Sequence, residues 1–292
     1  MTGLGDEIAL TFSCAGDALI GVLHLPVSAP TVGVVIVVGG PQYRVGSHRQ
    51  FLLLARALAA QGIAALRFDC RGMGDSDGIF PGFEQIEPDV AAAVDAMMNR
   101  VPSLRHVVLW GLCDANAAIA EHARRDARIA GIVLLNPWVR SDAGLARTQL
   151  KHYYLARLMQ RDFLRKVLTG RFNPIASVQA LVGNVVRAFG SAAPHARSSG
   201  DAAGNALAER MAAELQRFKG RVLIILSGRD LTAKEFADAA RSSKPWQKLY
   251  AEARVTRREF PAADHTFSRR AWRDQVAAWT SEWIKSGVPA ID

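Results

Sequence analysis

The sequence predicts an α/β fold: a mostly parallel, doubly wound sheet with a helical segment inserted late in the chain. Strand-like and helix-like segments alternate from residue 32 to residue 135, which is the rhythm of parallel strands joined by right-handed crossovers. Residues 32–38 read VGVVIVV, a β-branched run typical of a strand buried on both faces. The alternation stops at residue 138 and resumes after residue 219.

The elements follow in chain order. A hairpin is expected from Glu7–Cys14 and Ala18–Leu25, because Ala15-Gly16-Asp17 between them is a turn sequence. Helix Gln50–Gln61 should stop at Gly62, a residue type that commonly ends helices. The other expected elements are strand Ile63–Phe68, a helix around Phe83–Asn99, strand His106–Trp110, helix Asp114–Arg124, strands Ile129–Leu135, Val222–Leu226 and Arg254–Phe260, and closing helix Arg269–Lys285.

The break in the alternation predicts three parts: a core segment 1–137, a helical insertion 138–219 and a second core segment 220–292. Within the insertion we expect helices Leu150–Leu168 and Ala206–Phe218. A Ser/Ala/Gly-rich section near Ser191–Asn205 should be loose or disordered.

Composition excludes several classes of protein. Of 292 residues, 50% are hydrophobic and 22% charged, which excludes disorder as the main state. The longest apolar run is far shorter than the roughly 20 residues of a membrane span, and the first residues do not resemble a signal peptide. We therefore expect a cytoplasmic protein. Its three cysteines show no CxxC spacing, which argues against disulfides and zinc, and no cluster has metal-ligand spacing.

The net charge of +9 is concentrated in one segment. Residues 140–219 hold 13 Lys/Arg and 5 Asp/Glu, and the rest of the chain holds 23 and 22. A basic insertion of this kind fits an anionic substrate or an anionic membrane surface; a merely solvated face is the alternative. Nucleic-acid binding is not expected, because the segment has no recognisable reading motif.

Residues 107–120, VVLWGLCDANAAIA, carry the strongest chemical signal. A strand ends at Gly111-Leu112-Cys113-Asp114-Ala115 and a helix begins at once, which is the pattern of a nucleophile elbow with Cys113 in the nucleophile position. The helix N-terminus favours a thiolate there. Asp114 would oppose it unless its carboxylate turns away to cap the helix. The alternative is that Cys113 is simply a small buried apolar residue.

A cysteine nucleophile needs a base, and the base needs an orienting acid. Strand Val222–Leu226 is followed by Asp230, and strand Arg254–Phe260 is followed by His265. This is the chain order of nucleophile, acid and histidine that such an elbow requires. A helix-capping role for Asp230 and an exposed-loop position for His265 are the alternatives.

Acyl chemistry also needs donors for an oxyanion. We expect the Asp114 backbone N–H to be one donor and Gly40 to supply the other, with Gln42 as second choice, because Pro41 has no N–H. Arg44 and His48, in the segment YRVGSHR, either bind an anionic substrate group or belong to a solvated basic loop. The glycine-rich loop RGMGDSDG, residues 71–78, matches no nucleotide-binding pattern, so we expect no cofactor.

Together these motifs resemble the α/β-hydrolase family, through GGPQ, FDCRGMGDS, GLCDA, SGRD and ADHTF in the correct order. The stretches GGPQYRVGSHRQF and GLCDA look more narrowly like the exosortase A system-associated hydrolases. The resemblance implies an α/β-hydrolase fold of about eight strands, with residues 138–219 as a helical cap. It also implies Cys113 as nucleophile, Asp230 as acid and His265 as base. Cys in place of Ser, as in dienelactone hydrolases, argues against ordinary esterase or lipase activity.

The leading hypothesis is hydrolysis of an acyl ester or thioester through a Cys-His-Asp triad and an acyl-enzyme. A second hypothesis is transfer of the acyl group to a sugar or amine acceptor. A third is a non-catalytic protein that binds a ligand in the same pocket, which predicts that Cys113 shows no selective reactivity.

Overall fold

The computed structural model describes residues 5–40, 42–139 and 197–287, and in these ranges it contains one eight-stranded sheet. The strand order is β1-β2-β4-β3-β5-β6-β7-β8. Strands β3 to β8 run parallel, whereas β1 pairs antiparallel with β2, and β2 antiparallel with β4. The predicted mostly parallel, doubly wound sheet is confirmed.

The strands are β1 (Glu7–Cys14), β2 (Asp17–His24), β3 (Val32–Val37), β4 (Ala64–Phe68), β5 (His106–Leu112), β6 (Ile129–Leu135), β7 (Arg221–Ser227) and β8 (Val255–Phe260). The helices are α1 (Gln50–Ala60), α2 (Glu87–Arg100), α3 (Ala115–Arg125), α7 (Arg197–Arg217), α8 (Leu231–Ser242), α9 (Lys244–Tyr250) and α10 (Arg270–Lys285), with short 3₁₀ turns η1 (Ser47–Arg49) and η2 (Phe83–Gln85).

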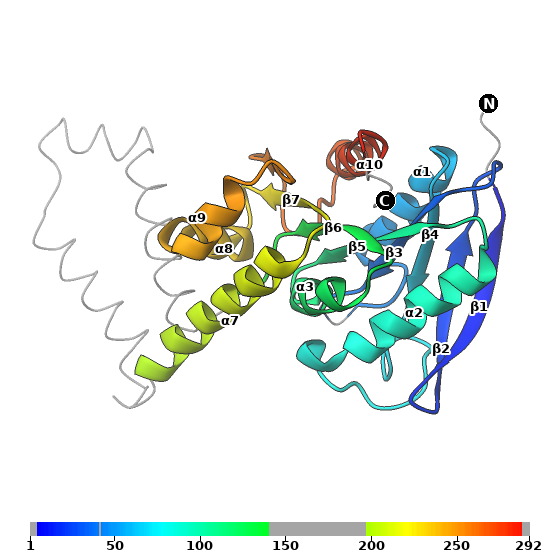
Figure 1. Cartoon of the computed structure of the whole chain (residues 1–292), viewed down its shortest axis with the longest axis horizontal. Helices are drawn as coiled ribbons and strands as arrows, with labels where there is room; N and C mark the ends of the chain where they lie inside the picture. The colour runs from blue at the N-terminus through cyan, green and yellow to red at the C-terminus, as the bar shows by residue number, and fades with distance from the viewer. Residues whose placement is uncertain (1–4, 41, 140–196, 288–292) are drawn as a thin grey trace, which may run out of the picture. The chain divides into compact units, whose positions relative to one another are not determined.

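Helices cover the sheet on both sides: α1 and α10 pack together on one face, and α2 and α3 on the other (Figure 1). Strands β4 and β6 are buried along their whole length, as expected for central strands covered on two faces. Strand β1 at the sheet edge instead alternates exposed and half-buried residues. Because β3, β5, β6, β7 and β8 run parallel, their carboxyl ends meet at one edge of the sheet.

Two helical segments differ from the sequence expectation. The helix expected from Phe83 is divided into η2 and α2, and α2 begins where Pro88 occupies its first turn, a position for which proline is pre-organised. Helix α9 was not predicted from the sequence. The first turns of α8 and α9 are capped by the side chains of Asp230 and Ser243.

The chain divides into two compact units, Met1–Val139 with Leu207–Asp292, and Arg140–Ala206. The end of the predicted insertion belongs to the first unit, because Leu207, Met211 and Leu215 of α7 are buried there. The expectation of a loose section up to Asn205 is wrong from Arg197 onward, where α7 begins. The helix expected at Leu150–Leu168 lies outside the described residues. None of the helices in the described ranges is both long and apolar enough to cross a membrane.

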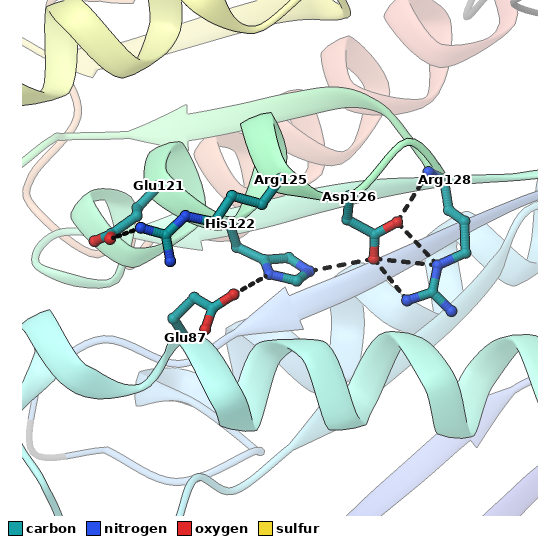
Figure 2. A network of polar contacts seen from close by, with 6 residues as sticks. All are labelled: Glu87, Glu121, His122, Arg125, Asp126 and Arg128. Carbon is teal, nitrogen blue, oxygen red and sulfur yellow. Dashed lines mark hydrogen bonds and ion pairs between the residues drawn. The ribbon is translucent and has the colours of Figure 1, made fainter.

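A polar network around His122 holds the C-terminal end of α3 (Figure 2). The buried His122 ring places Nδ1 2.8 Å from Glu87 Oε1 and Nε2 3.4 Å from Asp126 Oδ2. Arg128 binds Asp126 through a bidentate contact, with Nη2 2.6 Å from Oδ2. Because Glu87 belongs to α2, this network ties α3 to α2 at the end opposite Cys113.

A second buried histidine makes folding stability sensitive to acid. His24 is 1% exposed, and its Nε2 accepts a hydrogen bond from Arg67 Nε at 2.9 Å, which only a neutral ring can do. Burial, reinforced by the Arg67 charge, lowers the pKa of His24 from 6.5 to about 4. The unfolded chain therefore binds more protons between these values, and stability is lost as the pH falls through this window.

We expect the free energy of unfolding to drop by about 3 kcal/mol between pH 6.5 and pH 4 through His24 alone. Urea unfolding across this range checks it, with His24→Gln as the comparison, because Gln accepts the Arg67 hydrogen bond without titrating. The variant should keep a shallower pH dependence; parallel curves for the two proteins would contradict the assignment.

Candidate active site

The β5–α3 junction holds Cys113 in a left-handed backbone conformation, with φ of 64°. Strand β5 ends at Leu112 and α3 begins at Ala115. The Cys113 N–H donates to Leu135 O at 3.0 Å, which ties the turn to the end of β6. A non-glycine residue rarely adopts this conformation, and it is the strained turn of a nucleophile elbow.

Small residues let this turn form. A Cβ on Gly111 would lie 2.3 Å from Ile119 Cδ1 and 3.5 Å from Ala115 Cβ. A Cβ on Gly39, at the end of β3, would lie 2.1 Å from Leu112 O. The atom nearest to Gly39 is backbone, so the turn that follows β3 (the β3 turn) requires glycine at this position. A side chain at position 111 would instead require the end of the Ile119 side chain to shift.

The structure brings the predicted acid and base together. His265 Nδ1 lies 2.8 Å from Asp230 Oδ2. The Asp230 carboxylate also accepts the Thr232 N–H at 3.1 Å and the Ala233 N–H at 3.0 Å, so it caps α8 and holds His265 at once. Helix capping, the alternative considered for Asp230, is therefore compatible with the role as acid.

His265 is placed to carry a proton. Its burial lowers the pKa, but hydrogen bonds to Asp230 and to Cys113, and the charges of both groups, outweigh burial and raise the pKa of His265 to about 10. Since Nδ1 faces Asp230, the other ring nitrogen is the one available to Cys113. This arrangement favours the protonated form of His265.

The sequence analysis did not identify Asn136, a residue that holds the backbone of His265. Asn136, directly after β6, is fully buried with φ of 41°. Its Nδ2 donates to His265 O at 2.9 Å, and its Oδ1 accepts the Ser227 N–H at 2.8 Å. The side chain thus links the ends of β6 and β7 to the backbone of the histidine. The only signal in the sequence was an Asn at a predicted strand end.

Replacing Asn136 with Asp should add a second pH dependence to that of the wild-type activity. The new carboxyl group, while protonated, still donates to the His265 carbonyl, but once ionised it repels that oxygen. The kcat of Asn136→Asp relative to wild type should therefore fall as the pH rises, by up to about a hundredfold. Steady-state kinetics from pH 5 to pH 9 measure this. The matched control is Asn99→Asp, at an exposed position of α2, and identical pH profiles for all three proteins would refute the positioning role.

Two of the three expected oxyanion donors, the N–H groups of Gly40 and Gln42, are already engaged. The Gly40 N–H donates to Asp114 Oδ1 at 2.7 Å, and the Gln42 N–H donates to Gly40 O at 2.7 Å. The Asp114 side chain therefore does not cap α3, as the sequence allowed, but crosses to the β3 turn. Gln42 Oε1 accepts the Ser47 N–H at 2.8 Å.

Arg44 is held by carboxylates. One end of its guanidinium binds buried Asp69, and Nη2 lies 2.6 Å from Asp75 Oδ2. Its charge is thus balanced by two carboxylates, and it links the loop after β3 to the loop after β4. Binding of an anionic substrate group by Arg44 stays a prediction. His48 lies in η1 with φ of 52°. Its role in substrate binding stays a prediction.

A cavity of about 530 Å³ lies between these two loops. Gly40, Gln42 and Asp114 line one side, beside the elbow. The remaining lining residues are Tyr43, Gly72, Met73, Gly74, Phe80 and Phe83, so most of the wall is apolar or aromatic. Among the described residues, no group of three or more His, Cys, Asp or Glu side chains is placed to hold a metal ion.

Solved structures with this fold include proteins named as an esterase and as a dienelactone hydrolase. The esterase Pf2001 of Pyrococcus furiosus is 14% identical, with a TM-score of 0.65 over 98% of this chain and 94% of that one. Est1E of Butyrivibrio proteoclasticus, solved with ferulic acid bound, is 17% identical, with a TM-score of 0.61 over 95% and 98%. Dienelactone hydrolase from Anabaena variabilis is 15% identical, with a TM-score of 0.58 over 97% and 99%.

A comparison with curated protein sequences found no match. The family model described as serine aminopeptidase S33, Hydrolase_4, matches residues 29–266, from the start of β3 past the histidine. That span includes the elbow, Asp230 and His265, and it covers most of the chain. The protein therefore belongs to the Hydrolase_4 family of the α/β-hydrolase superfamily.

Proposed function

We propose that this protein hydrolyses an acyl ester or thioester through a Cys113-His265-Asp230 triad. The observation that carries the proposal is the elbow itself: Cys113 has φ of 64°, its thiol group helps to raise the pKa of His265, and His265 Nδ1 lies 2.8 Å from Asp230 Oδ2. A buried structural cysteine needs neither the strained turn nor the charged partner. Cys14 and Cys70 are such residues, since both are buried and burial raises the pKa of each thiol.

The reaction would proceed in two halves. The Cys113 thiolate attacks the carbonyl carbon, and the tetrahedral oxyanion takes hydrogen bonds from backbone N–H groups of Asp114 and Gly40. When the bond to the leaving alcohol or thiol breaks, the His265 imidazolium gives that group its proton. Water then attacks the acyl-enzyme while His265 takes a proton from it, the carbon–sulfur bond breaks, and the acid leaves.

The cavity beside the elbow indicates the class of acyl group. Met73, Phe80 and Phe83 form its apolar wall, and the two rings meet edge to face with centroids 4.8 Å apart. With Arg44 paired to Asp69 and Asp75, this cavity suits an uncharged, apolar or aromatic acyl chain. Pf2001, which shares the fold, is named as an esterase.

We also propose membership of the exosortase A system-associated subgroup, on the residues GGPQYRVGSHRQF and GLCDA. In the structure these two stretches are the β3 turn and the elbow, which contact each other through Gly40 and Asp114. Deleting the gene should alter exopolysaccharide production or its acylation. An unchanged exopolysaccharide would count against membership of the subgroup, but it would not bear on the proposed Cys113-His265-Asp230 triad.

Incubation with acyl donors tests the chemistry directly. Wild type and Cys113→Ala are mixed with acetyl and octanoyl thioesters and with p-nitrophenyl esters, and intact mass and released acid are recorded. Iodoacetamide labelling of the native protein is the control for thiol access: half-exposed Cys113 should react, whereas buried Cys14 and Cys70 should not.

A Cys113-dependent acyl adduct that decays in water supports hydrolysis. An adduct that persists until an alcohol or amine is added would instead establish acyl transfer with the same nucleophile. If iodoacetamide shows no selective labelling of Cys113 and no donor yields an adduct, the catalytic proposal fails and a ligand-binding protein is the better description.

A further inference from the structure

The Asp114 carboxylate occupies a donor that the proposed chemistry needs. Its Oδ1 accepts the Gly40 N–H at 2.7 Å, across 74 residues of sequence. The packing is close, because a Cβ on Gly39 would lie 2.6 Å from the same oxygen. A carboxylate oxygen on this N–H is placed as the oxyanion of an acyl intermediate would be.

A second observation places the same group in the substrate cavity. Asp114, Gly40 and Gln42 together line the cavity next to the elbow. A substrate carbonyl that enters this cavity and reaches Cys113 therefore meets Asp114 at the donor. The carboxylate and the carbonyl oxygen compete for one N–H, and the charged acceptor forms the stronger hydrogen bond.

We propose that Asp114 is a gate on the oxyanion site: its carboxylate holds the Gly40 N–H while no acyl group is bound and must leave this donor for the carbonyl oxygen to bind. The inference rests on the proposed Cys113 chemistry. It also defines selectivity, because a free carboxylate, such as the acid product, is repelled by Asp114, whereas a neutral ester or thioester is not. The gate would thus favour product release.

The charge on Asp114 should decide how tightly the gate holds. Burial raises the pKa of Asp114, opposed by hydrogen bonds from backbone amides, that of Gly40 foremost, and by the His265 charge. Among the described residues, the titratable groups near it include its chain neighbour Cys113, His265 on the loop after β8 and Tyr43 in the cavity wall. A protonated Asp114 is a weaker acceptor, so the gate loosens as the pH falls.

Two readouts test the gate: the acylation rate of Cys113 by octanoyl thioester, and inhibition by octanoate. Asp114→Ala should acylate about tenfold faster than wild type at pH 8, because a charged hydrogen bond no longer competes. It should also bind octanoate about tenfold more tightly. Both differences should shrink toward pH 5. Asp114→Asn should lie between the two proteins and lose the pH dependence of the gate.

Glu121→Gln removes an exposed carboxylate from the same helix and is the matched control. Slower acylation in Asp114→Ala, with octanoate inhibition and the pH profile unchanged, would overturn the gate and leave Asp114 as a support of the β3 turn. Failure of the proposed function is distinguishable, since then wild type and all variants would form no Cys113 adduct.

Discussion

Asp230→Asn should lower kcat/KM by about four orders of magnitude, as removal of the acid from such triads does. Asn has the same shape and is a good helix cap, so α8 should keep its first turn. Its amide, however, presents a donor or a neutral oxygen to His265 Nδ1 where a carboxylate now lies at 2.8 Å. The imidazolium loses its counter-charge, and the thiolate loses its partner.

The pH profile of this variant carries a second signature. In the wild type the pKa of His265 is raised to about 10, so the protonated histidine should persist until activity falls on the alkaline side near that pH. Without the Asp230 charge the pKa of His265 drops, and the alkaline limb should move to lower pH. Stopped-flow acylation from about pH 6 to about pH 10.5 covers the alkaline limbs of the wild type and of Asp230→Asn. It measures both the loss of rate and the shift of the alkaline limb.

Asp238→Asn is the control for this experiment. It makes the same chemical change on the same helix, α8, at a carboxylate that pairs with exposed Arg241. We expect its activity to stay within about twofold of wild type, since surface pairs contribute little. If Asp230→Asn kept a tenth of the wild-type activity, the acid would have to be another residue.

Gly39→Ala should have the next largest effect. The added methyl would lie 2.1 Å from Leu112 O and 2.6 Å from Asp114 Oδ1, and the first of these atoms is backbone that no side-chain rotation can move. The β3 turn must shift away from the elbow, and the Gly40 N–H with it. A misplacement of about 1 Å at a catalytic group costs about a hundredfold in rate.

The comparison for this variant is Gly62→Ala, at the end of α1. Gly62 has φ of 85°, so Ala there is strained, but no atom lies within 4 Å of the added Cβ. Gly62→Ala should therefore lose about 1 kcal/mol of stability and keep its activity. Urea unfolding and acylation rates on both variants separate the two effects; equal activity losses would show that Gly39 matters only through folding.

The sequence by itself determined the layout of the sheet and the order of its chemistry. A β-branched run such as Val32–Val37 is stable only when covered on both faces, so its burial follows from local composition. Cys113, Asp230 and His265 each follow a strand end, and parallel strands bring their carboxyl ends to one edge. Nearness of these three residues was therefore predictable without any knowledge of side-chain positions.

Only the tertiary structure decided which partners the polar side chains take. Arg44 pairs with Asp69 across 25 residues, Asn136 donates to His265 across 129, and Asp114 accepts from Gly40 across 74. Each side chain has several acceptors or donors within reach in the unfolded chain, and local propensity does not distinguish among them. The choice is made when packing excludes water and every buried polar group must find a partner. That is why the sequence could predict that Cys113, Asp230 and His265 follow strand ends at one edge of the sheet, but not that the Asp114 carboxylate accepts the Gly40 N–H.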